Sequence, residues 1–79
     1  MSGGAVSSVN VKVDRWNDCG TSGGWVDLYD SVTVRCQHVG DVYDQYGDSL
    51  WYYIDPAHGA RGWVPSTAIS VYGWSVATC

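Results

Sequence analysis

Several groups of residues carry side chains that could do chemistry. Asp41, Asp44 and Asp48 lie close together around Gly47 and offer carboxylate oxygens, which are the ligands that hard cations prefer. Their spacing does not follow the closer acid series, ended by a glutamate, of a helix–loop–helix calcium site. The sequence therefore favours a solvated acidic loop over a metal site at this place.

Thiol and imidazole groups are a second set of candidates. Cys36 and His38 would offer two zinc ligands from one segment, but no matched second pair accompanies them in the sequence. No pattern sets a nucleophile, a base and an orienting acid together, although Cys19 and His58 are both present. We therefore expect no metal, no cofactor and no enzymatic activity.

The aromatic residues are a third set, and their chemistry would be binding. The chain has five Trp and six Tyr but no Phe. Because a buried Trp or Tyr needs a partner for its N–H or O–H group, we expect several of these rings to be partly exposed. Aromatic grooves hold peptides and sugar rings by stacking and apolar contact. We predict a ligand-binding group made up of Trp16, Tyr43, Tyr46, Trp51, Trp63 and Pro65, with Trp25 as the alternative to Trp16.

The other interpretation is that these rings only cap a thin core from outside. The choice depends on the elements that position them. Residues 50–54 alternate in side-chain type and are rich in aromatic and β-branched residues, which predicts a strand. A turn with Pro56, His58 and Gly59 follows, and a second short strand ends at Pro65, because proline cannot donate to a ladder.

The two strands predict a β-hairpin, and alternation sorts its faces. The buried face should carry Leu50, Tyr52, Ile54 and Val64. The outward face should carry Trp51, Tyr53 and Trp63.

The rest of the chain reads as short strands separated by turn signals, with no useful helical period, which predicts an all-β domain. We expect residues 1–8 to be a flexible leader and residues 9–79 to be a single domain. Within that domain we expect strands at 9–13, 32–37 and 69–72 and a short strand or extended turn at 25–29. We also expect long loops at 14–24 and 38–48, a 3₁₀ turn at 66–68 and a tail at 73–79. The closing strand should pair with the strand at 9–13.

Composition excludes some classes of partner. The net charge is −4, every acid is Asp, and the chain has only four Lys and Arg residues. So few cations cannot neutralise a row of phosphates, so we expect no nucleic-acid partner. No apolar run approaches the length of a membrane span, so we expect no membrane partner either. The oligomeric state is left open.

Several motifs, taken in order, resemble a known family. Residues 32–37 read Val-Thr-Val-Arg-Cys-Gln, Tyr46-Gly47 and Leu50-Trp51 follow, and residues 62–66 read Gly-Trp-Val-Pro-Ser. This order resembles the SH3 (Src-homology-3) fold, and more narrowly the bacterial SH3-like domains of actinobacterial secreted and phage proteins. The resemblance implies a small five-stranded SH3-like barrel. It also implies a binding module that recognises cell-wall peptide or peptidoglycan through the aromatic groove.

The alternative function is a small phage or bacterial protein, structural or inhibitory, that docks on a partner protein. One departure from the family concerns the ligand. The eukaryotic groove uses a tyrosine shortly after its Pro-Ser pair, whereas Ser66, Thr67 and Ala68 supply none. This departure argues against a standard proline-rich ligand.

Three cysteines allow three different single disulfides, and the sequence alone does not choose between them. The resemblance implies the pair Cys36–Cys79, because the family's cysteine after Val-Thr-Val-x often pairs with a C-terminal one. Cys19 would then be a free thiol. If the disulfide forms, we expect a secreted or cell-wall-associated protein; otherwise we expect a cytoplasmic or virion-associated one.

Overall fold

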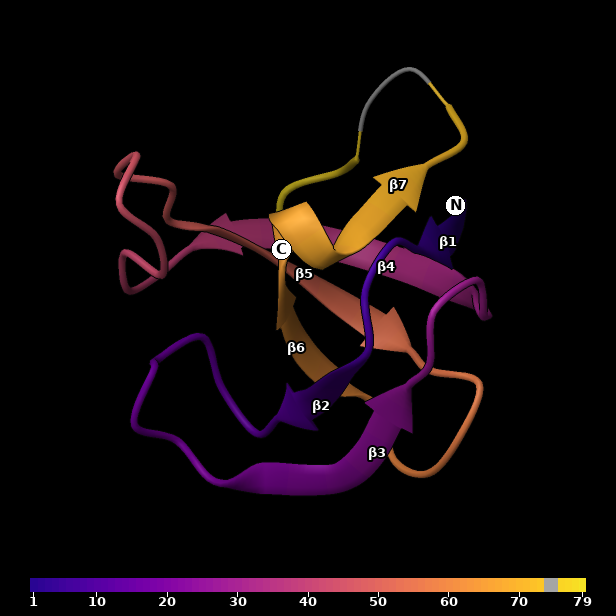
Figure 1. Ribbon diagram of the computed structural model, residues 1–79. Coiled ribbons are helices and arrows are strands. Elements are labelled where there is room, and N and C mark those ends of the chain that lie inside the picture. Colours follow the sequence, from indigo (N-terminus) through magenta and orange to yellow (C-terminus); the bar gives the residue numbers. More distant parts are fainter. Residues whose placement is uncertain (74–75) are drawn as a thin grey trace.

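The computed structural model describes residues 1–73 and 76–79 (Figure 1). Within these residues the chain is all-β, with seven strands in one antiparallel sheet of order β3-β2-β6-β5-β4-β1-β7. The elements are β1 (Ser2–Ala5), β2 (Val9–Lys12), β3 (Thr21–Val26), β4 (Ser31–Val39), β5 (Leu50–Asp55), β6 (Gly62–Pro65), the 3₁₀ turn η1 (Ser66–Ala68) and β7 (Ile69–Val71). In the described ranges, no helix is long and apolar enough to cross a membrane.

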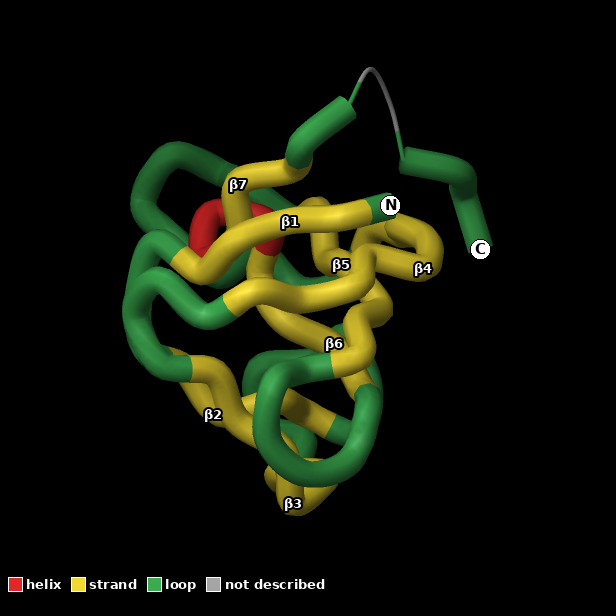
Figure 2. Tube along the Cα trace, turned by 90° about the vertical axis from the view of Figure 1, so that its right-hand side faces the viewer, coloured by secondary structure: helices red, strands yellow, loops and turns green. Residues whose placement is uncertain are grey.

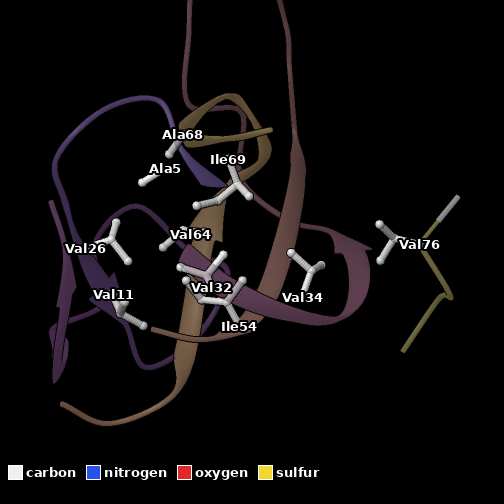
Figure 3. Close-up of a cluster of buried hydrophobic side chains, with 10 residues drawn as sticks. All are labelled: Ala5, Val11, Val26, Val32, Val34, Ile54, Val64, Ala68, Ile69 and Val76. Atoms are coloured by element: carbon white, nitrogen blue, oxygen red, sulfur yellow. The ribbon is translucent and has the colours of Figure 1, made fainter. Parts of the chain in front are cut away.

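The sheet curls around one hydrophobic core but does not close into a barrel. Val26 on the end strand β3 and Ile69 on the other end strand β7 belong to the same buried cluster (Figure 3). Within the described residues no ladder joins β3 to β7. The five strands that we expected are not confirmed, since the sheet has seven.

The predicted hairpin is confirmed. β5 and β6 pair in register, with Trp51 opposite Pro65 and Tyr53 opposite Trp63. On the inward face Ile54 and Val64 are fully buried, as alternation predicts. The 3₁₀ turn that we expected after Pro65 is also present, at the predicted residues.

The expectation of a flexible leader over residues 1–8 is wrong for Ser2–Ala5, which form β1. This strand lies between β4 and β7, and Figure 2 shows it running alongside β7. Gly3 and Gly4 make the fit possible, because a β-carbon on Gly3 would lie only 2.9 Å from the Ile69 side chain. The glycine pair that suggested flexibility allows close packing here instead.

The insertion of β1 changes two other expectations. The closing strand pairs with β1, with Ala5 opposite Ile69, and not with the strand at Val9–Lys12. That strand, β2, pairs with β3 and β6. The long loop expected at 14–24 is also shorter than predicted, because Thr21 already belongs to β3 and pairs with Lys12. The tail expected at 73–79 includes residues 74 and 75, which lie outside the described residues.

The end of the chain is fixed to β4. Cys36 and Cys79 form a disulfide, so the pairing that the resemblance implied is confirmed. The Gln37 N–H donates to the Ala77 carbonyl oxygen at 2.8 Å, and the Cys79 N–H donates to the Gln37 carbonyl oxygen at 2.9 Å. Val76, just before these residues, belongs to the core cluster. The disulfide and the backbone pairing therefore hold this segment against β4 together.

We expect the double variant Cys36→Ser, Cys79→Ser to lose about 4 kcal/mol of unfolding free energy. The reason is that the disulfide closes a loop with a sequence separation of 43, which restricts the unfolded chain. Urea unfolding followed by tryptophan fluorescence measures the loss. Cys19→Ser is the matched control, because Cys19 is a free thiol. An equal loss in both proteins would contradict this account.

Candidate functional site

Two loops meet over the outward face of the β5–β6 hairpin. One joins β2 to β3 and the other joins β4 to β5, and Figure 1 shows both on the same side of the molecule. Arg15 donates from Nε to the Val39 carbonyl oxygen at 2.8 Å, and the Asp41 N–H donates to the Arg15 carbonyl oxygen at 3.0 Å. Asn17 adds two bonds, from its backbone N–H to Asp41 Oδ2 at 2.9 Å and from Nδ2 to the Val42 carbonyl oxygen at 2.6 Å. These hydrogen bonds therefore join the two loops to each other beside the hairpin.

Trp51 lies under the second loop and is fully buried. Its Nε1–H donates to the Asp41 carbonyl oxygen at 3.0 Å, and the Tyr43 ring meets it edge-on at 5.5 Å between centroids. Gly40 also lies against it, since a β-carbon there would be 2.9 Å from Cδ1 of the indole. Trp51 is absent from the core cluster, as a residue of the outward face would be, but our expectation that its ring faces water is wrong. Alternation gives the face of a side chain and does not show what covers it.

Tyr43 also has a structural role. Its hydroxyl lies 2.7 Å from Ser66 Oγ, which ties the second loop to the 3₁₀ turn. Pro65 is half-buried and lies opposite Trp51 in the ladder. Of the six predicted ligand-binding residues, Trp51, Tyr43 and Pro65 thus form the covered base beneath the loops.

The second loop is also organised by its own carboxylates. Asp44 Oδ1 accepts the backbone N–H groups of Tyr46 at 3.0 Å and Asp48 at 3.1 Å. The pKa of Asp44 is lowered: burial opposes the shift, but the hydrogen bonds from Asp48, Tyr46 and Gly47 outweigh it. The hydrogen bond with Asp44 in turn raises the pKa of Asp48. Of the acidic residues that we noted in this loop, Asp44 therefore bonds to the loop's own backbone, whereas Asp41 accepts the N–H of Asn17 in the other loop.

A group of contacting side chains remains partly accessible at the surface, which we call the aromatic patch: Arg15, Trp16, Tyr53 and Trp63. The Arg15 guanidinium carbon lies 5.5 Å from the Trp16 ring centroid and 5.7 Å from the Trp63 ring centroid. The Trp63 and Tyr53 rings are 5.1 Å apart and tilted by 47°. Trp16 is 41% exposed, and the Tyr53 and Trp63 residues are half-buried. This arrangement presents flat apolar rings with a cation between two of them, which suits stacking and apolar contact with a ligand.

The structure thus brings together two of the six predicted residues, Trp16 and Trp63, in an accessible group. Tyr46 is 80% exposed, and among the described residues no ring contact joins it to another aromatic side chain. Sequence reasoning did not include Arg15 and Tyr53 in the site. For Tyr53 the signal was available, because alternation already placed it on the outward face beside Trp63. For Arg15 the signal was its position next to Trp16 in the loop.

A separate hollow of about 340 Å³ lies away from the aromatic patch, near the C-terminal segment. Its walls are mostly apolar and come from Gln37, His38, Val39, Leu50 and Thr78. None of the six residues predicted from the sequence lines it. Cys36 is already bonded to Cys79, so the Cys36–His38 zinc pair considered from the sequence is not available while the disulfide is intact.

Comparisons with known proteins add little to this geometry. No family model and no solved structure matches the chain. Among curated proteins, the human guanine nucleotide exchange factor DBS is 38% identical over 42 residues. That match covers 53% of this chain and 4% of the relative, so the chain spans only a small part of that protein's length. A match of this extent does not place the chain in a family.

The two kinds of tryptophan should respond differently to truncation. We expect Trp51→Ala to lower the free energy of unfolding by about 3–5 kcal/mol, because it empties a fully buried site and removes a hydrogen bond. Trp16→Ala should cost less than about 1 kcal/mol, because its side chain is at the surface. Urea unfolding by far-ultraviolet circular dichroism compares the two. Similar losses in both variants would contradict the assignment of Trp51 to the base and Trp16 to the patch.

Proposed function

We propose that this chain is a non-enzymatic binding module and that the aromatic patch is its ligand-binding surface. The observation that carries the proposal is the exposure of Trp16 beside Trp63, with the Arg15 guanidinium between the two rings. Trp63 lies on β6 of the hairpin, and Trp16 lies on the loop that Arg15 and Asn17 bond to the loop between β4 and β5. Rigid aromatic side chains lose little conformational entropy on binding, so a surface of this kind binds at low cost.

The ligand class that suits this patch is peptide-like, and bacterial cell-wall peptide is the member that the family resemblance implies. Rings stack on sugar faces and on apolar peptide side chains, whereas Arg15 offers a cation to a carbonyl or carboxylate group. Part of the guanidinium is already engaged, because Nε donates to Val39 and Nη1 lies 3.5 Å from Asp14 Oδ1. Arg15 therefore adds orientation more than net positive charge.

An SH3-like arrangement is part of the same proposal. The five strands of such a domain would be β1, β4, β5, β6 and β7, with β2 and β3 as the two arms of the long excursion between the first and second strands. The 3₁₀ turn between β6 and β7 and the position of the excursion beside the aromatic face support this assignment. The disulfide between Cys36 and Cys79 supports a secreted or wall-associated protein, because disulfides persist in oxidising compartments.

A second candidate uses the same patch for a partner protein. The observation that favours it is the net charge of −4, because bacterial walls are anionic and would repel an acidic domain. On this alternative the chain is a small phage or bacterial interaction protein, and the aromatic residues are the anchors of the protein–protein interface.

We expect purified peptidoglycan to retain the parent protein in a sedimentation assay and Trp16→Ala to weaken retention by about tenfold. Trp25→Ala is the matched control, because Trp25 is 44% exposed, close to the 41% of Trp16, but lies on β3 outside the patch. Equal weakening by both substitutions would contradict the patch as the site.

Failure of peptidoglycan to retain the parent protein would overturn the cell-wall ligand. Light scattering after size-exclusion chromatography then tests the second candidate, with a second copy of the chain as the partner protein. It measures whether the chain forms an oligomer. An oligomer that Trp16→Ala dissociates and Trp25→Ala does not would support docking through the patch. An oligomer that neither change affects would contradict such docking.

A further inference from the structure

Asp27, Asp30 and His58 place their side chains together at the other end of the β5–β6 hairpin. His58 lies in the turn between β5 and β6, which Figure 1 shows on the opposite side from the two loops of the patch. Its Nε2 atom is 3.3 Å from Asp30 Oδ2 and 3.7 Å from Asp27 Oδ2. One donor atom from each of the three residues lies within 4.8 Å of the other two. No sequence pattern indicated this group, because His58 is 28 residues from Asp30.

The two carboxylates stand on a constrained turn between β3 and β4. The Asp30 N–H donates to the Asp27 carbonyl oxygen at 3.0 Å, and Tyr29 adopts a φ of 72°, which is uncommon for a residue other than glycine. Ala5 of β1 holds the turn from outside: its N–H donates to the Asp30 carbonyl oxygen and its carbonyl oxygen accepts the Tyr29 N–H, both at 2.8 Å. The backbone of the turn is therefore fixed, and Asp30 Oδ2 also accepts the Asp27 backbone N–H at 2.8 Å.

The imidazole is held from the other side by Trp25. The two rings are stacked, with centroids 5.1 Å apart and planes 12° from parallel. The Trp25 N–H also donates to the His58 carbonyl oxygen at 3.0 Å. Gly24 and Gly59 allow this approach, because a β-carbon on Gly24 would collide with the Ala60 carbonyl oxygen and one on Gly59 with the Gly23 carbonyl oxygen. The main chain at His58 is therefore closely packed, and the stack with Trp25 supports the ring beside the carboxylates.

The distances suit a metal ion. With bonds of about 2.0–2.1 Å, two ligand atoms of tetrahedral zinc lie roughly 3.4 Å apart. The distances from His58 Nε2 to the two carboxylate oxygens, 3.3 and 3.7 Å, are close to that ligand-to-ligand distance. We propose that Asp27, Asp30 and His58 form a binding site for a divalent transition-metal ion of the zinc class, with water completing the coordination.

The charges and the donor types of the three residues support a zinc-class ion. Two carboxylates lie beside one imidazole, and among the described residues no lysine or arginine forms an ion pair with Asp27 or Asp30. An imidazole donor favours zinc-class ions over calcium or magnesium, which prefer an all-oxygen set. The imidazole side chain is 43% exposed, so an ion can enter from solvent. A bound ion would link the β3–β4 turn to the β5–β6 turn, at a site separate from the aromatic patch.

The test uses Zn²⁺ and the full chain after treatment with a chelator, without reductant so that the disulfide stays intact. Cys19→Ser serves as the background, because it removes the free thiol that would otherwise compete for zinc. Isothermal titration should show one Zn²⁺ per chain, and the C2–H resonance of His58, but not that of His38, should shift in the proton spectrum. Saturating Zn²⁺ should raise the melting temperature, because the ion binds the folded chain and not the unfolded one.

His58→Gln should weaken Zn²⁺ binding by roughly tenfold or more, since it removes one of three protein ligands. Asp30→Asn should weaken Zn²⁺ binding similarly, because the amide has the size of the carboxylate but no charge. This second variant leaves the stack of His58 on Trp25 in place, so it tests the site even if His58→Gln disturbs that stack. His38→Gln is the matched control, since His38 is the other histidine of the chain and lies on β4, outside this group. Absence of a His58 resonance shift in the background protein, or equal weakening by His38→Gln, would overturn the site.

Discussion

The burial of one indole determines how the rest of the outward face is organised. Trp51 is covered because the loop between β4 and β5 folds back over it and accepts its N–H at the Asp41 carbonyl oxygen. The same loop is bonded to the loop between β2 and β3 through Arg15 and Asn17. The loop that covers Trp51 is therefore also the loop that holds Arg15 and Asn17 in place. Arg15 then lies between Trp16 and Trp63, so the aromatic patch depends on the loop that buries Trp51.

Local patterns predicted the parts of the fold that depend on local chemistry. Alternation over 50–54 gave the hairpin and its inward face, and proline followed by small polar residues gave the 3₁₀ turn. The patterns failed where packing between distant segments decides the structure. Gly3 and Gly4 have the composition of a flexible segment, yet they form β1 because β4 and β7 leave a narrow place that larger residues would not fit. No property of residues 1–8 alone could show this.

The same limit explains which site residues were predicted. The sequence indicated that aromatic rings from the hairpin and the loops converge, and Trp16 and Trp63 do lie in one exposed group. It could not show that Trp51 and Tyr43 would be used for support, because exposure depends on the path of a loop with few periodic residues. The contact of Arg15 with Trp63 and the cluster around His58 join residues far apart in sequence, which periodicity does not report.

Different contacts support the two ends of the β5–β6 hairpin. This difference decides how far a change at the aromatic patch affects the position of His58. At the patch end, polar side chains such as Asn17 join the loops by hydrogen bonds. At the other end, backbone packs directly on backbone at Gly24 and Gly59, and Gly59 also has a φ of 75°. Such contacts leave little room for adjustment, so the position of His58 follows from the path of the chain. A change at the patch can therefore reach His58 through the regular ladder of β5 and β6, or through β3, whose Trp25 stacks on the imidazole.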